Sequence, residues 1–190
     1  SPKLGGMISG DFAPATRQLV SAFNLFVLPD AMLPPDLAGR TQGTIALSGK
    51  LASTLPDTAD ITDLKLTSTL VNTEGSARYD AGTITANLRG ALADLSLLAP
   101  AVRGQLDFAV DVSGPVAAPK IAAAISAAEI VAGGQTLTDL DAKFDGTADP
   151  AKPSGKLSAA LSVLGQTMAA SADVTALNGA ITIPNLSITA

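Results

Sequence analysis

The chain has 190 residues, a formal net charge of −5 and 47% hydrophobic residues, of which few are aromatic. This apolar content predicts a folded chain, and the acidic balance without any Lys/Arg cluster excludes a nucleic-acid-binding protein. The absence of His and Cys excludes Cys-based zinc sites, His-ligated haem and catalysis by Cys or His. We therefore expect no cofactor and no enzymatic activity.

The first element that the pattern predicts is an amphipathic helix over residues 14–28. Pro14 suits a first helical turn, and Leu19, Phe23, Phe26 and Val27 recur at helical spacing. We expect this helix to pack against the protein's own sheet. The proline-rich residues 29–39 are then an extended connection.

From about residue 40 to residue 190 the pattern changes to that of short β-strands. Apolar and polar residues alternate, and Gly-Gly, Asp-Gly and Asn178-Gly179 dipeptides punctuate the runs, the last being a signal for a two-residue hairpin. The lead-in at 91–104 breaks the period and predicts one or two helical turns or an ordered loop. Before it, strands are expected around Ile45, Leu64 and Ile84; after it, they are expected over 106–112, 121–131, 137–145, 156–163, 167–175, 180–183 and 186–189.

Imperfect internal echoes run through the strand region. "LSGKLAS" at 47–53 is echoed by "VSGPVAA" at 112–118, and "ITDLKLTSTL" at 61–70 by "LTDLDAKFDG" at 137–146 and, more faintly, by "IPNLSITA" at 183–190. Uneven spacing excludes a strict short-period solenoid. We interpret residues 1–190 as one slice of a longer β-repeat array with free sheet edges at both ends, and therefore expect edge-to-edge self-association.

The stretch "SGPVAAPKI" at 113–121 carries a family resemblance. Preceded by an alternating strand and followed by "GQTLTDLDAKFDG", it resembles the repeat of the TamB proteins, within the AsmA-like group of Gram-negative envelope proteins. The similarity is good over about 92–175, fair over 40–70 and absent over 7–36.

The resemblance implies an all-β fold, an elongated sheet curled lengthwise into a U with an apolar interior. It also implies a periplasmic location, an inner-membrane anchor outside residues 1–190 and an outer-membrane partner of the barrel-assembly type. The family is implicated in outer-membrane protein assembly and in phospholipid movement, which makes phospholipid acyl chains or outer-membrane protein strands the expected cargo.

The alternating apolar residues of the later strands are the candidate cargo-facing side chains. An acyl chain would need a continuous apolar strip without polar pockets. Two interpretations stay open: an open groove for apolar cargo, or a closed structural β-solenoid stalk of a surface or secreted protein whose faces pack on each other. The residues expected to face the groove are Leu106, Phe108, Val110, Val112, Leu140, Phe144, Leu157, Leu161 and Val163.

The acidic residues around 139–145 are the other cluster that could carry chemistry. Asp139, Asp141 and Asp145 are expected to share one strand face with Lys143 between them. No glycine-rich ligand loop surrounds them, so we interpret them as a solvated outer face that discourages aggregation and not as a Ca²⁺ site.

Overall fold

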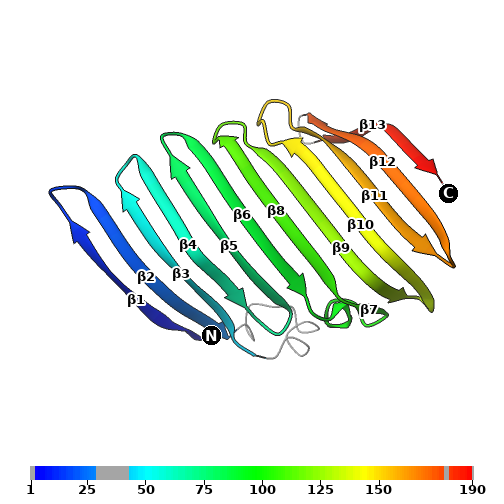
Figure 1. Ribbon diagram of the computed structural model, residues 1–190, viewed down its shortest axis with the longest axis horizontal. Coiled ribbons are helices and arrows are strands. Elements are labelled where there is room, and N and C mark those ends of the chain that lie inside the picture. Colours follow the sequence, from blue (N-terminus) through cyan, green and yellow to red (C-terminus); the bar gives the residue numbers. More distant parts are fainter. Residues whose placement is uncertain (1–2, 29–42, 178–179, 190) are drawn as a thin grey trace.

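The computed structural model describes residues 3–28, 43–177 and 180–189 (Figure 1). Thirteen strands form one antiparallel sheet. The first six are β1 (Lys3–Ala13), β2 (Gln18–Leu28), β3 (Ile45–Thr54), β4 (Thr58–Thr67), β5 (Val71–Asp80) and β6 (Thr83–Leu92). A 3-10 helix, η2 (Leu95–Leu97), then precedes β7 (Val102–Gly104), β8 (Leu106–Pro115), β9 (Lys120–Ala132), β10 (Gln135–Thr147), β11 (Ser154–Val163), β12 (Gln166–Leu177) and β13 (Ala180–Thr189).

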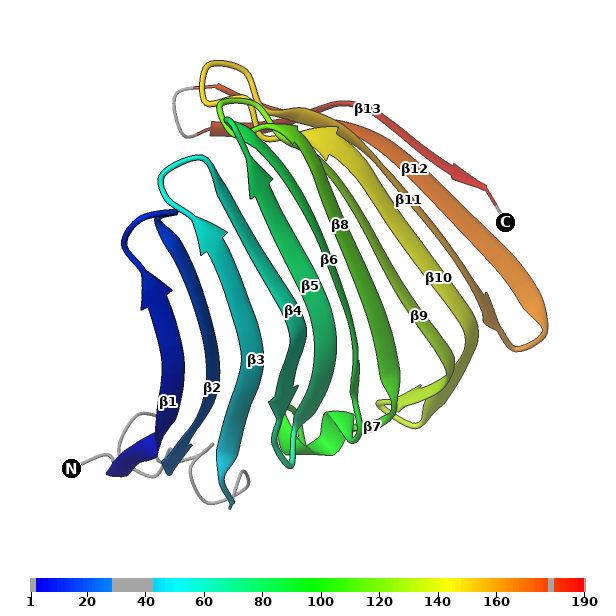
Figure 2. The ribbon, with the colours of Figure 1, turned by 60° about the vertical axis from the view of Figure 1, so that its left-hand side comes forward.

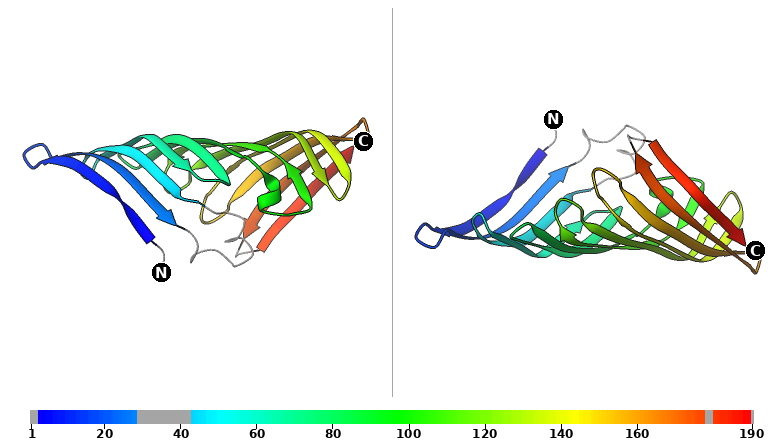
Figure 3. Two further views of the ribbon diagram at one scale, coloured as in Figure 1. Left: turned by 90° about the horizontal axis from the view of Figure 1, so that it is seen from below. Right: turned by 90° about the horizontal axis from the view of Figure 1, so that it is seen from above.

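The strands follow one another as a meander, so each pairs with its neighbours in the sequence (Figures 1 and 2). The exception is β7, which pairs with β9 beside β8. In Figure 3 the sheet is curved, and the β1–β2 end and the β12–β13 end both turn toward the same side. The two end strands, β1 and β13, do not pair with each other, so the described sheet is not closed. The all-β prediction is confirmed, and among the described strands β1 and β13 each have a partner on one side only.

The predicted helix over 14–28 is wrong. Residues 18–28 form β2, which pairs with β1 over eleven consecutive residue pairs, and residues 14–17 form the turn between them. Leu19, Phe23 and Val27 lie four residues apart, a spacing that puts side chains on one face in a strand as well as in a helix. Ser21 and Leu25 are half-buried on the same face as these residues, while the residues between them are exposed, which fits a strand and not a helix.

Most of the later predictions agree with the structure. The strands expected after residue 105 are present as β8 to β13, with 180–183 and 186–189 joined into the single strand β13. The predicted helical turn in the lead-in is η2, where the Asp94 carboxylate accepts a hydrogen bond of 2.8 Å from the Ser96 backbone N–H. The predicted connection at 29–39 and the turn at 178–179 lie outside the described residues, although Leu177 and Ala180 beside that turn are paired.

The strongest sequence echo marks a β-bulge. In "ITDL" Asp63 has a φ of 54°, and in "LTDL" Asp139 also has a φ of 54°. The pairing register shifts beside both, between β4 and β5 and between β10 and β11. Such an extra residue in the left-handed region bends a strand and increases its twist. The echo therefore repeats a bend in the sheet.

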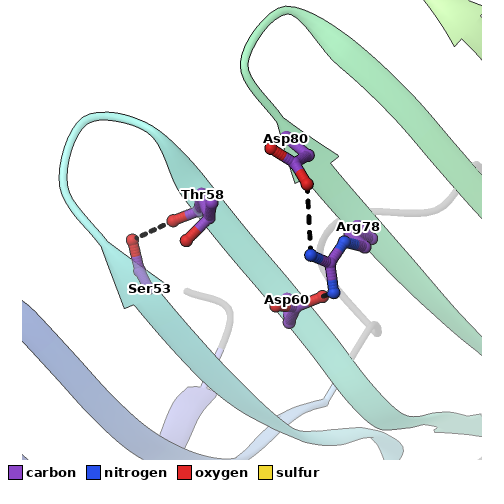
Figure 4. A network of polar contacts seen from close by, with 5 residues as sticks. All are labelled: Ser53, Thr58, Asp60, Arg78 and Asp80. Carbon is purple, nitrogen blue, oxygen red and sulfur yellow. Dashed lines mark hydrogen bonds and ion pairs between the residues drawn. The ribbon is translucent and has the colours of Figure 1, made fainter.

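The sheet has almost no buried core. Among the described residues the only buried apolar side chains are Leu95, Ala127 and Ala172. In the described part of the chain Ser53 is the one buried polar residue, and its hydroxyl donates a hydrogen bond of 2.7 Å to the Thr58 carbonyl oxygen (Figure 4). A sheet normally buries one face against a second layer; here the described chain supplies none.

Candidate apolar binding face

The pairing register divides the side chains of the sheet between two faces, because directly opposed residues in an antiparallel pair point to the same side. We call the side that carries Phe108 the apolar face and the side that carries Asp107 and Asp111 the polar face. Along β8 the apolar-face residues are half-buried and the polar-face residues are mostly exposed. This alternation is the local origin of the two faces.

One row of the apolar face can be followed through directly opposed pairs across twelve strands. It contains no charged residue, and at the strand spacing of sheets it is roughly 50 Å long. The row runs through Gly6, Leu25, Leu47, Leu66, Thr73, Gly90, Phe108, Ile125, Ala142, Ala159, Ala170 and Ile188.

A second row runs beside it and is likewise uncharged. Its residues are two positions away from those of the first row on β4, β5, β6 and β8 to β13, so both rows belong to one continuous surface. It runs through Leu64, Gly75, Leu88, Val110, Ala123, Phe144, Leu157, Ala172 and Leu186.

The structure places all nine predicted cargo-facing residues on the apolar face. Phe108 and Val110 lie in the two rows, with Leu106 and Val112 beside them on β8; Phe144 and Leu157 are directly opposed. The remaining residues reach the same face through the pairing of Leu140 with Ala127 and through the alternation along β11, which adds Leu161 and Val163.

Sequence reasoning missed the contribution of the first two strands. Leu4, Ile8 and Phe12 continue the apolar face on β1, where their relative exposures are 76%, 68% and 55%. These residues are four positions apart, and Gly6 and Gly10 between them mask the alternation. Period-two alternation in Leu19–Val27 was the signal that could have identified the hairpin.

Phenylalanine rings of the apolar face lie over glycines of the neighbouring strands. A methyl group built on Gly49 would be 2.6 Å from Cζ of Phe23, and one on Gly90 would be 2.7 Å from Cζ of Phe108. The Phe144 ring similarly occupies the space above Gly155. The rings therefore lie down on the sheet, and the apolar face is smooth where an upright ring would interrupt it.

The polar face carries ion pairs, both between neighbouring strands and within one strand. Arg78 Nη1 is 3.3 Å from Asp60 Oδ1, and Arg78 Nη2 is 3.2 Å from Asp80 Oδ2 (Figure 4). Hydrogen bonding to Asp80, with the charges of Asp60 and Asp80, raises the pKa of the Arg78 guanidinium. These groups are largely exposed, so such pairs add solubility more than stability.

The predicted acidic face is confirmed only in part. Asp141 and Asp145 lie on the polar face with Lys143, whose Nζ is 3.0 Å from Asp141 Oδ1. Asp139 instead occupies the bulge. No group of three or more metal-ligating side chains occurs in the described parts of the chain.

The polar face is hollowed in several places. Hollows of about 300 to 560 Å³ have floors of Ala and Ser and walls that include Asp141, Lys143, Lys156 and Asp173. Their charged walls and open shape suit water better than a hydrocarbon chain. The other face is therefore the better candidate for binding an apolar ligand.

No helix in residues 3–28, 43–177 or 180–189 is both long and apolar enough to cross a membrane. Comparison with known proteins adds no family: no protein-family model, characterised protein or solved structure matches the chain.

Proposed function

We propose that this chain is a β-groove segment of a TamB-like envelope protein that shields phospholipid acyl chains on its apolar face. In this proposal it works in the periplasm, is anchored to the inner membrane through a segment outside residues 1–190, and meets a barrel-assembly-type partner in the outer membrane. The observation that carries the proposal is an uncharged surface that crosses twelve strands and that no described residue covers.

The energetics favour passage along such a surface over tight binding at one point. Burying a methylene group yields about 0.8 kcal/mol, so a chain of about sixteen carbons gains on the order of 10 kcal/mol. A bilayer gives nearly the same gain. An open apolar face that matches the bilayer leaves little net barrier to entry, sliding or exit, and it needs no polar binding motif.

The closed solenoid stalk is the weaker alternative. Its strand faces would pack on one another and hide their large apolar side chains. In the described sheet Ile125, Leu157 and Met168 on the apolar face are 40%, 42% and 40% exposed. A single open layer with such exposure supports the groove.

The proposal predicts that one charge on the apolar face blocks acyl-chain traffic. Phe108→Asp should abolish binding of a fluorescent fatty acid and slow its transfer between phosphatidylcholine vesicles, because an unpaired carboxylate in contact with hydrocarbon is costly. The sheet should stay folded by circular dichroism, since an open face lets water reach the new charge.

Ala109→Asp is the matched control. Residue 109 follows Phe108 on β8, faces the polar side and lies opposite Arg89. This variant should bind and transfer fatty acid like the wild type. If Phe108→Asp unfolds the chain and the wild type carries no lipid, then the interior is a closed core and the groove is refuted.

A further inference from the structure

One hydroxyl group interrupts the hydrocarbon surface of the apolar face. Thr73 on β5 is the only residue with a polar side chain in the two rows, which otherwise consist of Gly, Ala, Val, Leu, Ile and Phe. The pairing register places it between Leu66 of β4 and Gly90 of β6. This makes Thr73 the candidate for contact with a polar part of a ligand on that face.

The Thr73 hydroxyl lies low on the sheet, over a glycine. A methyl group built on Gly90 would be 2.5 Å from Oγ1 of Thr73 and 2.7 Å from Cζ of Phe108, so the two side chains approach the same point from the strands on either side. Gly75, two positions along β5 in the second row, adds no side chain. Glycine inside a strand often marks a place where a ligand approaches the backbone closely.

This hydroxyl is available to a ligand. Thr73 is half-buried, and no hydrogen bond joins its side chain to another of the described residues. In the same part of the chain no unpartnered polar side-chain atom is buried, so solvent reaches the Thr73 oxygen. The hydroxyl can therefore donate a hydrogen bond to an acceptor that lies on the apolar face.

We propose that Thr73 binds the ester carbonyl oxygen of an acyl chain and thereby sets the position of that chain on the apolar face. The inference rests on the proposed function and adds a specificity-determining residue to it. An ester carbonyl is a neutral acceptor, which suits a hydroxyl on a surface whose two rows carry no cation. One hydrogen bond changes affinity only modestly, so it favours one position of the chain without preventing its passage.

The direction of the acyl chain follows from the width of the apolar face. Over β6 and β8 to β13 the two uncharged rows run side by side, whereas over β1 to β3 only the first row continues. The hydrocarbon tail therefore extends from Thr73 toward β13, over Val110 and Phe144.

The first test separates the ester group from the hydrocarbon. Methyl palmitate and an alkane of the same length are each used to displace a fluorescent fatty acid from the protein, which gives the affinity for each. Thr73→Val keeps the β-branched shape and removes the hydroxyl, so it should weaken binding of methyl palmitate about three- to tenfold, the effect of one hydrogen bond. Its affinity for the alkane should stay the same or rise, because valine adds apolar surface.

Two further variants show whether the hydroxyl itself is responsible. Thr73→Ser retains a hydroxyl and should keep the wild-type affinity for methyl palmitate. Thr85→Val removes an exposed hydroxyl from the polar face of β6, opposite Arg78, and should change neither affinity. If Thr73→Val changes neither affinity or lowers both equally, Thr73 has a structural role only and the proposal is overturned.

Photo-cross-linking tests the position of the chain. A benzoylphenylalanine replaces either Leu88 on β6 or Ala142 on β10, one and four strand spacings from Thr73, roughly 5 and 19 Å. After irradiation with methyl palmitate, mass spectrometry should map the label from position 88 to the ester end of the chain and the label from position 142 to its methyl end. In Thr73→Val this preference should be lost. An even distribution at both positions in the wild type overturns the proposed position.

The outcomes separate this inference from the proposed function. A wild type that binds neither methyl palmitate nor the alkane refutes both. A wild type that binds both, with no loss of ester binding in Thr73→Val, is consistent with an acyl-chain surface and overturns the role of Thr73.

Discussion

The phenylalanines show how single residues determine the shape of the apolar face. Aromatic residues are 3% of the sequence, and three of its five Phe lie on this face over a glycine of a neighbouring strand. On the polar face, Phe26 likewise occupies the space above Gly5. A glycine in a strand weakens it, and an aromatic ring laid over it restores lost contact. The pairing keeps large apolar area on a shallow surface.

This account predicts a coupling between Gly49 and Phe23. Gly49→Ala should destabilise the protein by about 1–3 kcal/mol, because the new methyl group must displace the ring. In a Phe23→Ala background the same change should be neutral or stabilising. Urea unfolding of the double-mutant cycle measures the difference. An equal cost in both backgrounds would show that the ring does not hold that position.

A second prediction at this scale concerns the exposed ion pair beside the first bulge. Lys50 Nζ is 2.7 Å from Asp63 Oδ2, and the hydrogen bond from Lys50, with its charge, holds the pKa of the Asp63 carboxyl below its ordinary value. Any stability from this shift is present above the ordinary carboxyl pKa and is lost as the pH falls through the lowered one. Because both groups are exposed, that contribution is small.

The measurement is a carboxyl titration by NMR. The pKa of Asp63 should lie below the ordinary aspartate value in the wild type and move back toward it in Lys50→Met. An Asp63 pKa that is the same in both proteins would mean that the pair does not persist in solution.

At the scale of elements, the repeated "TDL" triplet encodes a bend. Aspartate tolerates the left-handed region better than most residues, since its short side chain can hydrogen-bond locally. Both Asp63 and Asp139 use this region beside a register shift. The fainter echo at Asn185 also accompanies a register shift, between β12 and β13. The echoes that suggested a repeat are thus repeats of local geometry.

The bulge interpretation predicts a residue-specific pattern at position 63. Asp63→Gly should leave the free energy of unfolding unchanged within about 0.5 kcal/mol, while Asp63→Val should lower it by about 1–2 kcal/mol, because a β-branched residue resists positive φ. Thr62→Val, at the next exposed position, should be nearly neutral. Denaturant unfolding distinguishes these; equal losses for Gly and Val at position 63 would argue against the bulge.

Much of the strand region could be predicted because apolar residues alternate with polar ones every second position, and successive side chains of a strand also alternate between its two faces. From β8 onward the predicted apolar residues all fall on one face. The hairpin of β1 and β2 could not be predicted as readily: Gly5, Gly6 and Gly10 interrupt the alternation, and i, i+4 spacing is shared by strands and helices. The bulges were also not predicted. One extra residue moves the following side chains to the opposite face, but it leaves the composition of the strand unchanged.

At the scale of the whole molecule, the sheet has two chemically distinct sides and one layer. Both rows of the apolar face are uncharged, whereas Arg78, Asp111 and Lys143 lie on the polar face. Isolated folded proteins seldom leave such a large apolar patch exposed, and one that does marks an interaction surface. The open architecture and the apolar rows together support the proposal that this side binds hydrocarbon.

Photo-cross-linking from two adjacent positions tests this central claim most directly. A benzoylphenylalanine replaces either Val110 on the apolar face or Asp111 on the polar face, and the protein is irradiated with phosphatidylcholine vesicles. Mass spectrometry should find a phospholipid adduct from position 110 and little or none from position 111. Equal labelling at both positions, or none at position 110, would contradict an acyl-chain surface on the apolar face.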